Sequence, residues 1–245
     1  MARPLKSIII IGATSGIGAE IARQLITQGW RVGVAGRRIE ELEKLVDIAP
    51  ERVVTQRVDL NTEECANQIQ TLLAKMGKVD IYLHCSGIGR QNQELDIEIE
   101  MATVATNGDG FMRSTITAFN HFRGCGGGHI AAITSVAGVR GGGNAPAYSA
   151  TKAMQSTYID SLAQLSNMER LNITFSDILP GFVATPLLRD HKYPMLMDVE
   201  YAAAKIIKAL KSRRRRAVID WKYSLLIFVW RLIPKYIWER LNIRG

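Results

Sequence analysis

The stretch SIIIIGATSGIG, residues 7–18, decides the fold class. Its apolar run, Ile8 to Ile11, lacks in-out alternation, which is typical of a parallel strand covered on both faces. Gly12, Gly16 and Gly18 follow where the strand pattern turns helical. In a Rossmann-type unit, glycines at this turn let backbone amides and a helix N-terminus approach a pyrophosphate. The spacing is not G-x-G-x-x-G, so the motif by itself also fits a plain strand-to-helix turn.

Short β-branched runs alternate with longer helical patterns along the chain. This alternation predicts βαβ units and an α/β fold, a Rossmann-type doubly wound parallel sheet. No linker or internal repeat divides the chain, so we expect a single domain at 1–220 and a hydrophobic, aromatic and basic tail at 221–245. The predicted strands are 7–11, 31–35, 52–58, 79–84, 129–135, 173–179 and 217–220.

Composition limits the classes of partner. Lys and Arg number 31 against 23 Asp and Glu, giving a net charge of +8. This charge favours a nucleotide cofactor, a nucleic acid or an anionic membrane, and does not choose among them. Cys65, Cys85 and Cys125 lack CxxC spacing, which argues against a disulfide framework and a zinc site. We therefore expect no metal and a reducing, cytoplasmic location.

Two arginines follow the second predicted strand. Many dinucleotide-binding proteins place an acidic residue here for the ribose hydroxyl, whereas this chain has Arg37 and Arg38. A guanidinium suits a 2′-phosphate, which favours NADP(H) over NAD(H). The alternative is that both are solvated loop charges.

The segment AYSATK carries the candidate chemistry. Tyr148 and Lys152 are four residues apart, so on a helix they share one face. A nearby ammonium favours phenolate and would lower the pKa of the phenol, making Tyr148 a useful proton donor. Ser135 ends a predicted strand at the carboxyl edge of the sheet, where its hydroxyl could hold a carbonyl oxygen. An ordinary exposed Tyr–Lys pair remains the alternative for AYSATK alone.

In chain order, the glycine turn, VDL, CSG, ATN, ITS, YSATK and PGFVATP resemble the short-chain dehydrogenase/reductase family from Lys6 to Val218. The resemblance implies that Tyr148 is the acid/base and that Lys152 lowers its pKa and binds the nicotinamide ribose. It further implies that Ser135 orients the substrate oxygen and that Asn107 supports Lys152 through a water relay. The cofactor-binding positions it implies are Gly12, Thr14, Ser15, Gly16, Ile17, Gly18, Arg37, Arg38, Asp59, Leu60, Gly87, Asn107, Tyr148, Lys152, Pro180, Gly181, Val183 and Thr185.

The sequence departs from the family pattern at two places. Ile11 replaces the threonine usual before the first glycine, and Cys85-Ser86-Gly87 replaces the usual Asn-Ala-Gly. We expect these changes to affect stability more than chemistry, with Cys85 a buried structural thiol. Beyond PGFVATP, His191 and Lys192 could meet an acidic substrate or be exposed loop charges.

Two basic segments near the end of the chain are assigned to roles other than nucleic-acid binding. KSRRRR, residues 211–216, is interpreted as the close of a helix, where cations complement the helix dipole. The tail holds Trp221, Trp230 and Trp238 around an apolar core too short to span a bilayer. It fits an interfacial element on an anionic membrane or a contact with the core or a second subunit.

These observations predict an NADP(H)-dependent oxidoreductase that transfers hydride between the nicotinamide and a carbonyl or secondary alcohol. Reduction of a ketone is the favoured direction, and a tail on a membrane would suggest a lipidic ketone. The rival hypotheses are a non-catalytic NADP(H)-binding sensor or scaffold and a lipid-surface protein. The resemblance further implies a homodimer or homotetramer built through long central helices.

Overall fold

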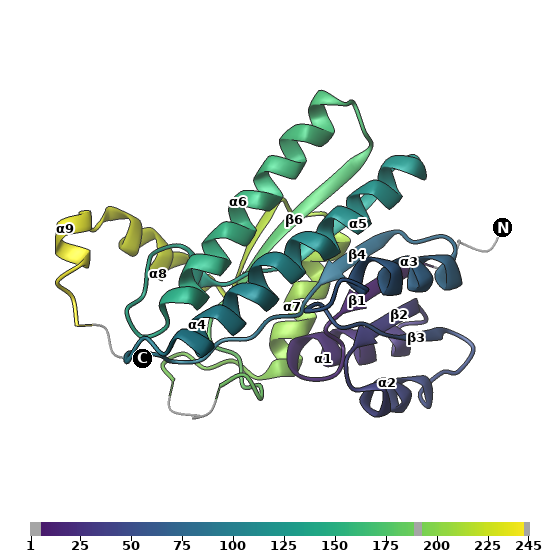
Figure 1. The fold of residues 1–245 in the computed structure, drawn as a ribbon, viewed down its shortest axis with the longest axis horizontal. Helices are drawn as coiled ribbons and strands as arrows, with labels where there is room; N and C mark the ends of the chain where they lie inside the picture. The colour runs from purple at the N-terminus through teal and green to yellow at the C-terminus, as the bar shows by residue number, and fades with distance from the viewer. Residues whose placement is uncertain (1–5, 189–192, 243–245) are drawn as a thin grey trace.

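In the computed structural model, which describes residues 6–188 and 193–242, seven parallel strands form one sheet in the order β3-β2-β1-β4-β5-β6-β7 (Figure 1). The predicted doubly wound parallel sheet is confirmed. The strands are β1 Ser7–Ile11, β2 Arg31–Gly36, β3 Val53–Arg57, β4 Ile81–His84, β5 Gly128–Ile133, β6 Ile173–Pro180 and β7 Arg216–Ile219.

The helices cover both faces of the sheet. They are α1 Gly16–Thr27, α2 Ile39–Val46, α3 Cys65–Met76, α4 Ile97–Val104, α5 Phe111–Gly124, α6 Pro146–Met168, α7 Val199–Lys211, α8 Trp221–Leu232 and α9 Lys235–Trp238. A π-helical turn, η1 Ala105–Gly110, joins α4 to α5, and a 3₁₀ turn, η2 Val136–Gly138, follows β5.

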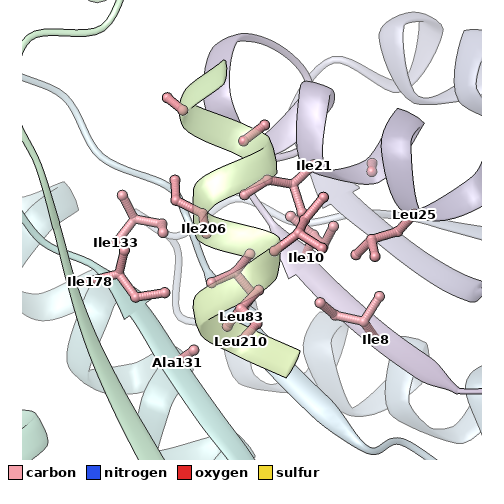
Figure 2. Close-up of a cluster of buried hydrophobic side chains, with 14 of the residues drawn as sticks. Ile8, Ile10, Ile21, Leu25, Leu83, Ala131, Ile133, Ile178, Ile206 and Leu210 are labelled. Atoms are coloured by element: carbon pink, nitrogen blue, oxygen red, sulfur yellow. The ribbon is translucent and has the colours of Figure 1, made fainter. Parts of the chain in front are cut away.

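The isoleucines of β1 show why the apolar run lacks alternation. Ile8 and Ile10 enter the core under α1, α2, α7 and α8, whereas Ile9 and Ile11 enter the core under α3, α5 and α6. Figure 2 shows the first of these cores, where α1 and α7 pack over the sheet. Full burial of each such side chain stabilises the fold by about 1.5–3 kcal/mol. Both faces of the strand therefore select apolar residues.

The strand order places a crevice beside β1. Strands β2 and β3 lie on one side of β1, and β4 to β7 lie on the other. In open α/β sheets, ligands bind outside the carboxyl ends of the strands at this reversal of order. The segments after Ile11 and His84 therefore form the centre of the candidate site.

Glycines and basic residues mark the ends of two helices. Helix α5 ends at Gly124 and β5 begins at Gly128, with Gly127 between them at a φ of +124° that suits glycine. Helix α7 ends at Lys211, with Lys208 and Lys211 in its last turn, so the basic run does close a helix.

The C-terminal segment is anchored to the domain. The Asp220 side chain accepts a hydrogen bond from the Lys222 amide and caps α8. Tyr223 and Ile227 of α8 are 1% and 5% exposed and belong to the first core. Within residues 6–188 and 193–242, no helix is long and apolar enough to cross a bilayer.

Candidate active site

At the glycine turn, the backbone after β1 lies close to the backbone after β4 and to the first turn of α1. A Cβ on Gly12 would lie 2.6 Å from the Ser86 nitrogen, and one on Gly18 would lie 2.2 Å from the Gly12 oxygen. Gly12 also has a φ of +92°. The first turn of α1 holds no acidic side chain, and Ser15 does not cap it with its hydroxyl. Its free amides and lack of Cβ atoms fit the diphosphate of a dinucleotide.

The two arginines after β2 have different surroundings. Arg38 Nη2 donates to Thr14 Oγ1 at 2.9 Å and to Ser15 Oγ at 3.0 Å, so its guanidinium lies over the glycine turn. Arg37 is exposed, and within the described part of the chain its side chain forms no hydrogen bond or ion pair. A solvated loop charge therefore fits Arg37 as well as a phosphate-binding role does.

Ser135 and Tyr148 meet at the carboxyl end of β5. The two hydroxyls share a hydrogen bond, and Ser135 Oγ also accepts from the Ala137 amide at 3.1 Å. Gly89 lets the backbone pass close to the Tyr148 ring, because a Cβ at this position would lie 2.5 Å from Tyr148 Cδ2. The structure thus brings the predicted pair together, and it adds Gly89, whose role the sequence analysis missed.

Lys152 lies one turn along α6 and is 4% exposed. Its Nζ is 5.8 Å from the centroid of the Tyr148 ring and donates to the Ile133 carbonyl and to Gln155 Oε1, each at 3.0 Å. A Cβ on Gly87 would lie 3.3 Å from this Nζ. The predicted cofactor loop therefore passes directly over the lysine.

The side chain of Gln155 joins Asn107 to Lys152. Gln155 Nε2 donates to the Asn107 carbonyl at 2.8 Å while Gln155 Oε1 accepts from Lys152. The side chain of Asn107 exchanges hydrogen bonds with the backbone of Ile88 at 2.7 and 2.9 Å. Sequence reasoning missed Gln155, although a fully buried amide three residues after Lys152 shares its helix face.

Burial shifts the pKa of both Tyr148 and Lys152. Burial raises the pKa of Tyr148, and the hydrogen bond from Ser135 opposes this rise. Burial also lowers the pKa of Lys152 to about 8, against the opposing influence of Cys85 and Asp177. Lys152 is not among these influences on the Tyr148 pKa, because its ammonium is directed at Ile133 and Gln155, so its expected role in lowering that pKa stays a prediction. The phenol is protonated at neutral pH.

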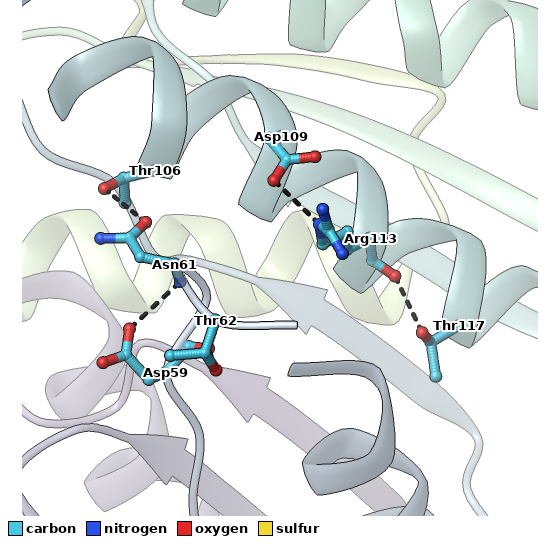
Figure 3. Close-up of polar contacts among 7 residues, drawn as sticks. All are labelled: Asp59, Asn61, Thr62, Thr106, Asp109, Arg113 and Thr117. Atoms are coloured by element: carbon cyan, nitrogen blue, oxygen red, sulfur yellow. Dashed lines mark hydrogen bonds and ion pairs between the residues drawn. The ribbon is translucent and has the colours of Figure 1, made fainter. Parts of the chain in front are cut away.

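Asp59 and Leu60 follow β3 at the expected edge of the site. Asp59 Oδ1 accepts from the Asn61 amide at 3.1 Å, and Asn61 Oδ1 accepts from Thr106 Oγ1 at 3.0 Å (Figure 3). These bonds tie the end of β3 to η1, which holds Asn107; wide π-helical turns of this kind recur at functional sites. The Leu60 side chain belongs to the second core, which leaves its backbone for any cofactor contact.

The segment Pro180 to Thr185 returns to the glycine turn. Thr185 Cγ2 lies 3.2 Å from where a Gly16 Cβ would be, so this segment packs against the start of α1. Tyr223 of α8 holds this segment in place. Its ring fills the space beside Gly181, and its hydroxyl accepts from the Phe182 amide at 2.9 Å.

The C-terminal segment also holds the loop between Ser135 and Tyr148. Arg140 Nη2 donates to the Ile233 carbonyl at 2.7 Å, and Trp238 Nε1 donates to the Gly141 carbonyl at 2.8 Å. Sequence reasoning missed this contact, since nothing local relates residues 140–141 to 233–238.

The two departures from the family pattern are accommodated. Ile11 is buried, and the turn is instead held by the Gly12 and Ala13 amides, which both donate to the Ala35 carbonyl. Cys85 is half-buried rather than fully buried, and desolvation of its thiol raises its pKa to about 12, which fits a structural role.

The remaining predicted residues have plain roles or lie elsewhere. His84 and His129 are buried and form hydrogen bonds with Ser114 and Ser176. Val183 forms a bridge with Met197, and Ile17 packs against the first core. His191 and Lys192 fall outside the described residues.

Comparisons with known proteins agree with this geometry. The family model for short chain dehydrogenases matches residues 6–195. Acetoacetyl-CoA reductase of an Acinetobacter species is 31% identical over 206 residues, which are 80% of this chain and 81% of the relative.

Two solved structures share the architecture. A short chain dehydrogenase from Burkholderia cenocepacia in complex with NADP has a TM-score of 0.82 at 19% identity, with 98% of each chain covered. The 3-ketoacyl-(acyl-carrier-protein) reductase from Brucella melitensis complexed with NADH has a TM-score of 0.78 at 25% identity, covering 88% of this chain and 96% of that one.

The matched family model, the doubly wound sheet and the glycine turn identify the class as nicotinamide-dependent oxidoreductases. The chain belongs to the short-chain dehydrogenase family.

Proposed function

We propose that this protein is an NADP(H)-dependent oxidoreductase that reduces a ketone, with Tyr148 as the proton donor. The observation that carries the proposal is the group formed by the buried Ser135, Lys152 and Asn107 and the half-buried Tyr148, which the loop after β4 connects to the glycine turn. A sensor or scaffold would need the fold but not this complete set. The Burkholderia structure in complex with NADP supports the fold alone. The proposed preference for NADP(H) over NAD(H) rests on Arg37 and Arg38.

The residues of this chain divide the chemistry between them. Bound NADPH would supply the hydride, held by the amides of the glycine turn and by Lys152. Because burial raises its pKa, Tyr148 keeps its proton at neutral pH and can give it to the oxygen of a carbonyl as that oxygen gains charge. Ser135, bonded to the same hydroxyl, would hold that oxygen and stabilise the resulting phenolate.

The proton donor is tested by Tyr148→Phe, which keeps the ring in contact with Gly89. We expect NADPH oxidation to fall at least about a hundredfold, while NADPH affinity stays within about twofold. Tyr158→Phe, on the same helix outside the site, is the matched control. Turnover retained by Tyr148→Phe would remove the catalytic assignment. The substrate is sought by an NADPH oxidation screen over ketones, aldehydes, quinones, sugars and long-chain oxo-lipids.

The cofactor preference is tested at Arg37. Arg37→Asp should weaken NADPH binding and shift the preference toward NADH, because a carboxylate repels a 2′-phosphate and accepts from a ribose hydroxyl. Arg31→Asp, at the opposite end of β2, is the control for charge. Unchanged NADPH affinity in Arg37→Asp would exclude the 2′-phosphate role.

A homodimer or homotetramer is the oligomeric state we propose. Helices α4 and α5 carry exposed apolar side chains, of which Ile97 is 69% and Ile116 is 42% exposed. Large exposed apolar surface of this kind marks interaction sites. Ile116→Glu should produce a monomer in light scattering, and Met168→Glu, at the far end of α6, should not.

A further inference from the structure

Helix α8 carries apolar side chains on both of its faces. Tyr223 and Ile227 point into the core, as described above. The opposite side is the outer face of α8, whose members are spaced by three, four or seven residues and so share one stripe. These members are Trp221 at 69% exposure, Leu225 at 58%, Phe228 at 61%, Val229 at 47% and Leu232 at 67%.

Exposed apolar side chains also follow α8 in the sequence. Tyr236, Ile237 and Leu241 are 61%, 38% and 44% exposed, and together with the outer face of α8 they form the C-terminal apolar surface. These eight side chains are a large share of the nineteen exposed large apolar side chains in the described part of the chain. Figure 1 shows α8 and α9 projecting at one end of the molecule, near the N-terminal end of α6. Apolar surface this concentrated marks an interaction site.

Positive charge borders this surface. Arg214, Arg216 and Arg231 line a hollow of about 500 Å³ together with Phe228. Within the described residues, neither Arg214 nor Arg231 forms an ion pair with a carboxylate, while Arg216 lies 3.7 Å from Asp177. Residues 221–242 contain four basic side chains and one acidic one, Glu239, which lies 3.9 Å from Lys235. The occupant therefore needs apolar and anionic groups together.

A symmetric contact between two copies fits this surface poorly. An isologous interface sets the same patch of both subunits face to face. The arginines beside Phe228 would then approach their own copies with little acidic compensation. A membrane of anionic lipid provides acyl chains for the stripe and phosphates for its basic border.

We propose that the C-terminal apolar surface docks on an anionic lipid bilayer, with the outer face of α8 at the boundary between headgroups and acyl chains. The helix has 12 residues and lies on the bilayer rather than crossing it. Hydrogen bonds of Arg140 and Trp238 join the C-terminal segment to the loop between Ser135 and Tyr148, so docking would bring this loop near the bilayer. The docking is independent of the proposed reaction.

Vesicle co-sedimentation of the full chain tests the proposal. We expect binding to vesicles of about 70% phosphatidylcholine and 30% phosphatidylglycerol, and weak binding to phosphatidylcholine alone. High salt should reduce the binding, because the basic border is solvent-exposed. Absence of binding to the anionic vesicles at low salt would overturn the proposal.

Two variants separate the apolar and basic contributions. Leu225→Ser/Phe228→Ser/Leu232→Ser should lose vesicle binding, and the control Ile48→Ser/Met168→Ser, which removes exposed apolar groups elsewhere, should keep it. Unfolding curves verify that each variant is folded. Equal binding by the triple variant and the wild type would refute a role for the stripe.

The arginines are tested separately, which keeps the proposal falsifiable if the triple variant fails to fold. Arg214→Gln/Arg231→Gln should bind anionic vesicles roughly 30-fold more weakly, since each basic residue near the surface contributes about fivefold. Lys78→Gln/Arg170→Gln is the matched control. The triple variant could change the oligomeric state while the double arginine variant binds vesicles as the wild type does. In that case the surface contacts a second copy of the chain and the proposal is wrong.

Discussion

Replacing Lys152 by Met should stabilise the apoprotein near neutral pH relative to high pH. Burial lowers the pKa of this lysine to about 8 from an ordinary value of 10.5, so the folded state carries an unfavourable ammonium at pH 7. Between these two values the unfolded chain binds more protons than the folded one, so wild-type stability rises with pH. The rise begins as pH passes the folded pKa and is complete above the unfolded pKa.

The magnitude follows from the same two values. From about pH 7 to about pH 9.5 the wild type should gain about 2 kcal/mol of unfolding free energy relative to Lys152→Met. At pH 7 the variant escapes the burial cost but leaves Gln155 Oε1 without its donor, which costs about 1–3 kcal/mol. The pH dependence of the difference is therefore a sharper signature than the difference at one pH.

Urea unfolding at a series of pH values measures this effect. The exposed lysine variant Lys205→Met controls for removal of a positive charge, and its stability should run parallel to that of the wild type. Parallel curves for the wild type and Lys152→Met would refute a buried ammonium with a lowered pKa. Lys152→Met should also lose NADPH turnover, since it removes a group that touches the cofactor in the proposed function.

Three further predictions test the contacts around the site. Gln155→Leu removes an acceptor from the Lys152 ammonium and should lower the pKa of Lys152. The decline of kcat at alkaline pH should therefore begin at a lower pH; an unchanged pH profile of kcat would show that Gln155 does not stabilise the ammonium. Gly18→Ala places a Cβ 2.2 Å from a backbone oxygen and should lower NADPH affinity at least about tenfold in titration, whereas Gly124→Ala, which has nothing within 4 Å, should bind normally. Trp238→Phe removes the donor to the Gly141 carbonyl and should raise the KM for the carbonyl substrate without changing NADPH affinity; an effect equal to that of Trp221→Phe would contradict this role.

Much of the site was predictable because its residues act through local spacing. The glycines at 12, 16 and 18 define a turn whatever surrounds them, and Tyr148 and Lys152 share a face as soon as α6 forms. The direction of the Tyr148 pKa was not predictable in this way. It depends on how deeply distant segments bury the phenol and on which acceptors take the ammonium of Lys152, of which the Ile133 carbonyl comes from β5.

The sequence by itself determined the α/β class, the order of strands and helices, and the identity of the residues at the switch point, since these follow from hydrophobic period and turn chemistry. Only the tertiary structure decided that Gln155 joins Lys152 to Asn107, that Tyr223 holds the segment after β6, and that α8 exposes an apolar face. The physical reason is that packing between segments far apart in the chain sets which side chains lose water and which keep it.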